Sequence, residues 1–142
     1  MVTFGQAIAS GFKNYVVWKG RATRAEFWWW YLFYFLVTLP FNIWYQVSVQ
    51  ATISDITNAG GTTEQYVAAL NAALFGPAYF VLVIVALALF LPTLAMVIRR
   101  LHDQNKSGGY WWMVLIPLAG PIILFVFMLL PSNPEGSRFD AK

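Results

Sequence analysis

The sequence contains no cysteine and a single histidine, His102. The lack of cysteine excludes disulfides, cysteine-ligated zinc, iron–sulfur clusters and a thiol nucleophile, and one histidine cannot build a multi-histidine zinc site. Charged residues make up only 11% of the 142 residues, against about 25% in an average soluble domain. The long apolar runs contain no Asp, Glu, Lys or His, which argues against a proton pump or an ion-coupled transporter. We therefore predict no metal, no cofactor and no enzymatic activity.

Apolar and aromatic residues are present in excess. Apolar residues make up 59% of the chain, which contains 7 Trp, 7 Tyr and 12 Phe. A small soluble domain leaves much of its surface exposed and could not hide this much apolar area, whereas Trp and Tyr gather at membrane–water interfaces. The net charge of +3 is too small for a general nucleic-acid binder. The composition therefore predicts an all-α integral membrane protein with a single membrane domain, 1–142.

The N-terminal residues have the pattern of an amphipathic helix. Apolar side chains recur every three or four positions over residues 3–18, and Thr3 with Gln6 matches a capping box. We expect this helix to lie flat in the membrane interface. The alternative is an ordinary helix packed against the protein's own cytoplasmic loops.

Three longer apolar runs predict membrane-spanning helices. The third run contains Pro117, Gly120 and Pro121 in its middle, so its freed backbone groups must face protein or water. We favour a broken full span there, with a re-entrant hairpin as the alternative. Aromatic clusters at Trp28–Trp30 and Trp111–Trp112 are expected in the interface belt. The predicted segments are span one at 27–48, an extracytoplasmic loop with a short helix at 49–73, span two at 74–98, a cytoplasmic loop at 99–109, span three at 110–130 and a polar tail at 131–142.

Basic residues predict the orientation in the membrane. The segment 46–73 contains no Lys or Arg, whereas basic residues gather before span one and after span two. The positive-inside rule then puts the N-terminus and the 99–109 loop in the cytoplasm. A full third span would send Arg138 and Lys142 to the opposite side, and a re-entrant one would keep all basic residues inside. The residues that set this orientation are Lys13, Lys19, Arg21, Arg24, Arg99, Arg100 and Lys106.

Two motifs stand out. Residues 20–28 read Gly-Arg-x-x-Arg-x-Glu-Phe-Trp, and residues 99–108 read Arg-Arg-Leu-His-Asp-Gln-Asn-Lys-Ser-Gly before Tyr-Trp-Trp at 110–112. With these two motifs in this order, the chain resembles the bacterial membrane family known as domain of unknown function 805. Gly109 is an added residue relative to that pattern, and the tail 137–140 lacks the usual Asn and final Gly. The resemblance implies a multi-pass protein of the bacterial inner membrane and implies no activity.

The basic residues beside the span ends form the candidate site. Guanidinium groups bind phosphate in a forked geometry, and basic pockets on the cytoplasmic side suit anionic lipid headgroups. Alternatively, the arginines anchor the span ends and pair internally with Glu26 and Asp103. The candidate residues for an anionic headgroup or a partner are Arg21, Arg24, Arg99, Arg100, His102, Asp103 and Lys106.

The sequence leaves three possible functions. We favour a small non-enzymatic accessory or scaffold subunit that packs against a larger membrane complex or against itself. The second is a carrier or sensor of anionic lipid or small anions that uses the arginine cluster. The third, and least favoured, is a membrane enzyme with His102 and Asp103 as an acid–base pair, because Ser107 is the sole nearby candidate nucleophile.

Overall fold

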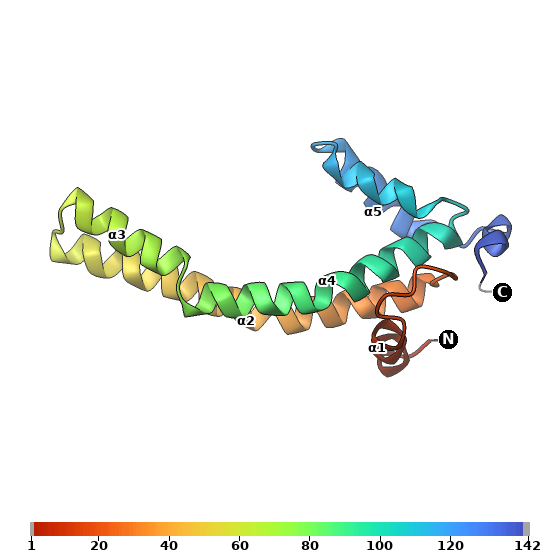
Figure 1. Ribbon diagram of the computed structural model, residues 1–142, viewed down its shortest axis with the longest axis horizontal. Helices are drawn as coiled ribbons and strands as arrows, with labels where there is room; N and C mark the ends of the chain where they lie inside the picture. Colours follow the sequence, from red (N-terminus) through yellow and green to blue (C-terminus); the bar gives the residue numbers. More distant parts are fainter. Residues whose placement is uncertain (1, 141–142) are drawn as a thin grey trace. The chain divides into compact units, whose positions relative to one another are not determined.

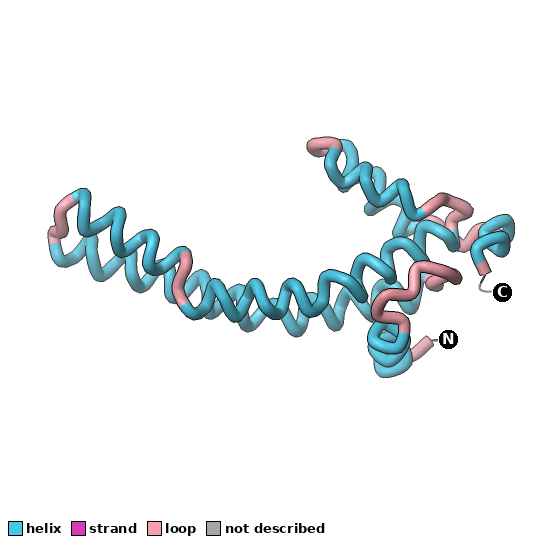
Figure 2. Tube along the Cα trace, viewed as in Figure 1, coloured by secondary structure: helices cyan, strands magenta, loops and turns pink. Residues whose placement is uncertain are grey.

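The computed structural model describes residues 2–140, and in that range it contains helices and loops but no strand (Figure 2). The all-α prediction is therefore confirmed, while the predicted tail residue Lys142 lies outside the described residues. Two compact units form: a terminal unit of the described residues up to Phe33 and from Phe90 onward, and a central unit, Tyr34–Leu89. The elements in Figure 1 are α1 (Phe4–Lys13), α2 (Arg24–Ala59), α3 (Thr63–Leu74), α4 (Pro77–Asp103), the 3₁₀ helix η1 (Gly108–Leu115), α5 (Ala119–Leu129) and the 3₁₀ helix η2 (Pro134–Phe139).

Two helical stretches are long and apolar enough to cross a membrane. They are Arg24–Ala59 and Thr63–Asp103, with mean hydropathies of 1.3 and 2.9 over their most apolar 18 residues. Only 6% and 22% of those apolar stretches are buried inside the protein. The central helix of a soluble protein would be mostly covered, so these apolar faces need a lipid environment.

Helix α1 is shorter than predicted and packs on the start of α2. It ends at Lys13 rather than at residue 18, because the Asn14 amide and backbone N–H both bond the Ser10 carbonyl. The predicted capping box at its N-terminus is present. Gly11 is buried against the Trp30 ring, where any Cβ would overlap the ring atoms. One face of α1 therefore contacts protein, and Phe12 packs edge-on against Trp30 at 5.4 Å between ring centroids.

Helix α2 continues beyond the predicted span one. Residues 49–59, predicted as a loop, are helical up to Ala59. Their hydroxyls donate to carbonyls one turn earlier, as between Thr52 and Ser48 at 3.0 Å and between Thr57 and Ile53 at 2.8 Å. Ser and Thr favour loops when they compete with the backbone, but here they bond inside the helix. The turn comes only after α2, at Gly60, where φ is +62°.

The central unit is a helical hairpin. In Figure 1, α3 runs beside the second half of α2. Thr62 and Gln65 form a capping box at the start of α3. The Tyr45 hydroxyl reaches the Leu74 carbonyl at 3.5 Å, and its ring lies 6.3 Å from that of Tyr79. Aromatic contacts and a helix-end hydrogen bond thus join α2 to the α3–α4 turn.

Helix α4 also exceeds its predicted length. It ends at Asp103, so residues 99–103, predicted as part of a cytoplasmic loop, form its last turn. Cations are favoured there by the helix dipole. The end is a Schellman motif: the Lys106 N–H bonds the Leu101 carbonyl and the Asn105 N–H bonds that of His102, both at 2.9 Å. Asn105 takes the left-handed position with φ +57°, a conformation in which Asn is better tolerated than most residues.

The third apolar run is broken, as predicted. The break falls at Pro117, between η1 and α5, while Gly120 and Pro121 lie in the first turn of α5. Gly120 lets α5 pack onto η1, since a Cβ there would overlap the Met113 carbonyl. With 11 residues, α5 is about 16 Å long, roughly half the thickness of a bilayer's hydrocarbon core. Neither η1 nor α5 can cross a membrane by itself.

Trp30 stands at the centre of the terminal unit. Predicted at the membrane interface, it is instead fully buried, because its indole N–H bonds the Thr93 hydroxyl of α4 at 3.1 Å and Gly11 leaves room for its ring. Tryptophan can be buried when its N–H has such a partner. The core around it consists of Ala22, Phe27, Met96, Leu101, Leu124 and Met128.

Candidate binding site at the arginine-rich helix ends

Arg100 and Asp103 form a buried ion pair at the end of α4. The two residues are 0% and 3% exposed and bond directly, one helical turn apart. The Arg100 guanidinium also donates to the carbonyls of Met128 and Leu130 at the end of α5. The Ser132 hydroxyl donates to the Asp103 carboxylate at 2.6 Å. This network ties the end of α4 to the end of α5, and it satisfies α5 carbonyls that have no partner within their own helix.

Arg99 and Glu26 form a second pair, between α4 and α2. Their closest atoms are 3.5 Å apart, and the Ser10 hydroxyl of α1 donates to the same carboxylate at 2.6 Å. The Glu26 N–H bonds the Thr23 hydroxyl at 3.2 Å, as in a capping box, while its carboxylate turns to Ser10 and Arg99. Arg99 Nε is buried without a partner among the described residues. The pair joins three helices.

The polar tail closes over the ends of α2 and α4. The His102 ring stacks on Phe139 with 4.2 Å between centroids and 3° between planes, and its Nδ1 lies 3.2 Å from the Gly20 carbonyl. Arg21 pairs with the Asp140 carboxylate at 2.6 Å, and this hydrogen bond raises the pKa of the guanidinium above its usual value. Gly136 permits the close approach, since a Cβ there would lie 2.5 Å from the His102 carbonyl.

The structure brings most of the predicted site residues together, but most of them already have a partner within the protein. Arg21, Arg99 and Arg100 each have a carboxylate partner. Lys106 instead places its ammonium group 4.3 Å from the centroid of the Phe127 ring, a cation–π contact. Arg24 is exposed, and its guanidinium donates to the Leu129 carbonyl at 3.4 Å. Binding of an anionic headgroup by the whole cluster remains a prediction.

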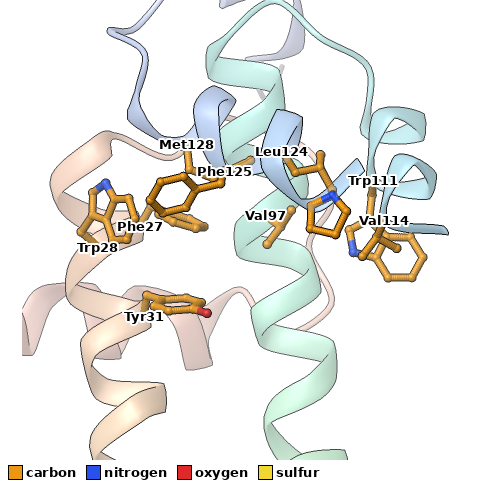
Figure 3. A pocket seen from close by; sticks show the side chains of 10 residues that line it. Phe27, Trp28, Tyr31, Val97, Trp111, Val114, Leu124, Phe125 and Met128 are labelled. Carbon is orange, nitrogen blue, oxygen red and sulfur yellow. The ribbon is translucent and has the colours of Figure 1, made fainter. Parts of the chain in front are cut away.

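An apolar groove lies beside these networks. Its volume is about 290 Å³, and Figure 3 shows side chains from α2, α4, η1 and α5 surrounding it. Tyr31 is the one lining residue with a hydroxyl. The residues lining the groove are Phe27, Trp28, Tyr31, Val97, Trp111, Val114, Pro121, Leu124, Phe125 and Met128.

The arrangement offers little for acid–base or metal chemistry. The His102 ring has one nitrogen against a backbone carbonyl and one face against Phe139. The Asp103 carboxylate is shared between Arg100 and Ser132. In residues 2–140, no group of three His, Asp or Glu side chains is placed to hold a metal ion.

Sequence reasoning missed the partners that the tail supplies. Ser132 bonds Asp103, Phe139 stacks on His102, and Asp140 pairs with Arg21. One available signal was charge balance, because the tail carries carboxylates near an excess of cations. The small residue Gly136 was a second signal, since it marks a close approach of two backbones.

Long apolar helices left uncovered by protein, with ion pairs gathered at one set of helix ends, define a small helical membrane protein. Comparison of the sequence with known protein families identifies the family. Residues 15–141 match the model of the family described as "Protein of unknown function (DUF805)", and the chain belongs to this family. The resemblance stated from the motifs is thus confirmed.

Two relatives from Escherichia coli (strain K12) support this assignment. Inner membrane protein YhaI is 31% identical over 127 residues, which cover 89% of this chain and 86% of the relative. Inner membrane protein YhaH is 32% identical over 129 residues, covering 89% and 87%. No solved structure shows a significant match.

Proposed function

We propose that the protein is a small non-enzymatic inner-membrane subunit that packs laterally against another helical membrane protein or a second copy of itself. The observation that carries this proposal is that the charged groups at the end of α4 make internal contacts. Arg99, Arg100, His102 and Asp103 all hold helices and tail together, so they act as a structural clamp. With the clamp closed, the surface left for a partner is the lateral one.

A polar ridge on α2 is the best candidate for that lateral contact. Asn42, Gln46, Gln50 and Ser54 recur every fourth residue and are exposed. The last three border one shallow depression in the central unit. Residues four apart form ridges that pack into grooves of a neighbouring helix, and amide side chains form hydrogen bonds between membrane helices. The ridge supports association with a helix rather than with a soluble ligand.

Native mass spectrometry of the protein extracted from its own membrane in a mild detergent tests this proposal. We expect a stoichiometric complex with a second protein or a homo-oligomer. A double variant, Gln46→Leu with Gln50→Leu, should shift the population to free monomer. The matched control is Ser48→Ala, which lies on the side of α2 that borders α3. A wild-type protein that arrives as a stable monomer would refute the proposal.

We also propose that η1 and α5 form a re-entrant hairpin and that the N-terminus and tail lie in the cytoplasm. Three observations support this topology. The tail residues Asn133 and Asp140 bond Asp103 and Arg21, so the chain returns after α5 to the helix ends it left. The hairpin is too short to cross twice as helix. In this arrangement Arg138 joins the other basic residues on one side, as the positive-inside rule favours.

A further inference from the structure

The groove in Figure 3 has the character of a site for an aliphatic chain. Its volume of about 290 Å³ is about twice that of a 150 Å³ engineered cavity that binds benzene. Aromatic and aliphatic side chains line it, among them Trp28 and Phe125, whose ring centroids lie 6.0 Å apart, and Val97 and Leu124. An aliphatic chain would gain apolar contacts there without leaving polar groups unpaired.

Arg24 lies about one helical turn before the first α2 residues that line the groove. It is the first residue of α2, and Phe27, Trp28 and Tyr31 follow on the same helix face at spacings of three, four and seven. Its guanidinium lies 3.4 Å from the Leu129 carbonyl, next in sequence to Met128, which lines the groove. Arg24 therefore lies next to residues that line the groove.

Arg24 also has unused binding capacity. Among the four arginines predicted for the site, it alone forms no ion pair within residues 2–140. A guanidinium has five N–H donors, and one weak hydrogen bond occupies at most one of them. The positive end of the α2 dipole adds to the local preference for an anion.

We propose that the groove holds one acyl chain of an anionic phospholipid and that Arg24 binds the phosphate of the same molecule. The chemistry is complementary at both ends, with apolar lining for the chain and uncommitted donors for the phosphate. The site differs from the arginine cluster, whose other members are paired. The inference does not depend on association through the α2 ridge, because the groove lies within the terminal unit.

The experiment uses the delipidated full chain in a mild detergent, titrated with dioleoyl phosphatidylglycerol or dioleoyl phosphatidylcholine. Native mass spectrometry measures the singly bound complex. We expect the anionic lipid to bind at concentrations about tenfold lower, the effect of roughly one charge-assisted hydrogen bond. Glycerol phosphate without acyl chains should not bind. Equal binding of the two lipids, or binding of glycerol phosphate as strong as that of the lipid, would overturn the proposal.

Two variants with matched controls locate the site. Arg24→Gln should abolish the preference for the anionic lipid, whereas Lys13→Gln, an exposed cation outside the groove, should retain it. Val114→Trp should block the groove and weaken the binding of both lipids. Val67→Trp should leave the binding of both lipids unchanged, because Val67 lies on α3 with a side chain 52% exposed. Far-UV circular dichroism verifies that each variant is folded. An unchanged preference in Arg24→Gln, or unchanged binding in Val114→Trp, contradicts the assignment.

Discussion

Replacing Arg100 with methionine should be far more damaging than the same change at Arg21, although both arginines pair with an aspartate. Arg100 is 0% exposed and bonds Asp103 together with two carbonyls at the end of α5. Breaking a buried pair by removing one partner costs about 3–5 kcal/mol, because the remaining charge stays buried and unpaired. The Arg21–Asp140 pair has side chains 31% and 50% exposed, and such exposed pairs contribute less than about 1 kcal/mol.

The free energy of unfolding is measured by titrating the purified variants from nonionic detergent into SDS and following far-UV circular dichroism. We expect Arg100→Met to lower it by about 3–5 kcal/mol and Arg21→Met by less than about 1 kcal/mol. The double variant Arg100→Met with Asp103→Leu should be less destabilised than Arg100→Met alone, because it buries no unpaired charge. Equal losses for Arg100→Met and Arg21→Met would refute the reasoning.

Two further predictions concern packing and topology. Gly11→Ala should destabilise the protein by about 1–3 kcal/mol because its Cβ would overlap the Trp30 ring. Gly5→Ala should be neutral or slightly stabilising, because nothing lies within 4 Å of the added Cβ. Thermal unfolding in detergent measures both variants, and equal effects of the two would contradict the prediction. Since the chain has no cysteine, a membrane-impermeant maleimide applied to spheroplasts should label Asp55→Cys and should label Ser137→Cys only after lysis. Labelling of Ser137→Cys in intact spheroplasts would instead favour a full third span.

Elements that depend on local chemistry could be predicted from the sequence. The capping box at Thr3 begins a helix where expected, and Pro117 breaks the third apolar run. Helix ends were harder to predict. The Ser and Thr residues of 49–59 bond within α2, and α4 runs on to Asp103. A Ser or Thr hydroxyl can bond a carbonyl in a loop or a carbonyl one turn earlier in a helix. Which of these carbonyls is within reach is decided only once the helix has formed.

The candidate site was predictable in its members but not in its pairing. Charge patterns gathered Arg99, Arg100 and Asp103 at one set of helix ends, and the structure joins them into networks. Their division into paired and unpaired groups depends on residues distant in sequence, such as Glu26 and Ser132. The groove likewise forms only where α2, α4, η1 and α5 come together. Sequence periodicity describes single helices and contains no information on which helices meet.

The clamp has a consequence for the order of folding. Its contacts join residues far apart in the chain, 73 positions for Arg99 and Glu26 and 82 for His102 and Gly20. Helices form from local bonds in about a microsecond, whereas contacts of long sequence separation must first overcome the entropy of loop closure. The helices therefore form first and the clamp closes late. We therefore expect Arg100 and Asp103 to become buried only when these contacts form.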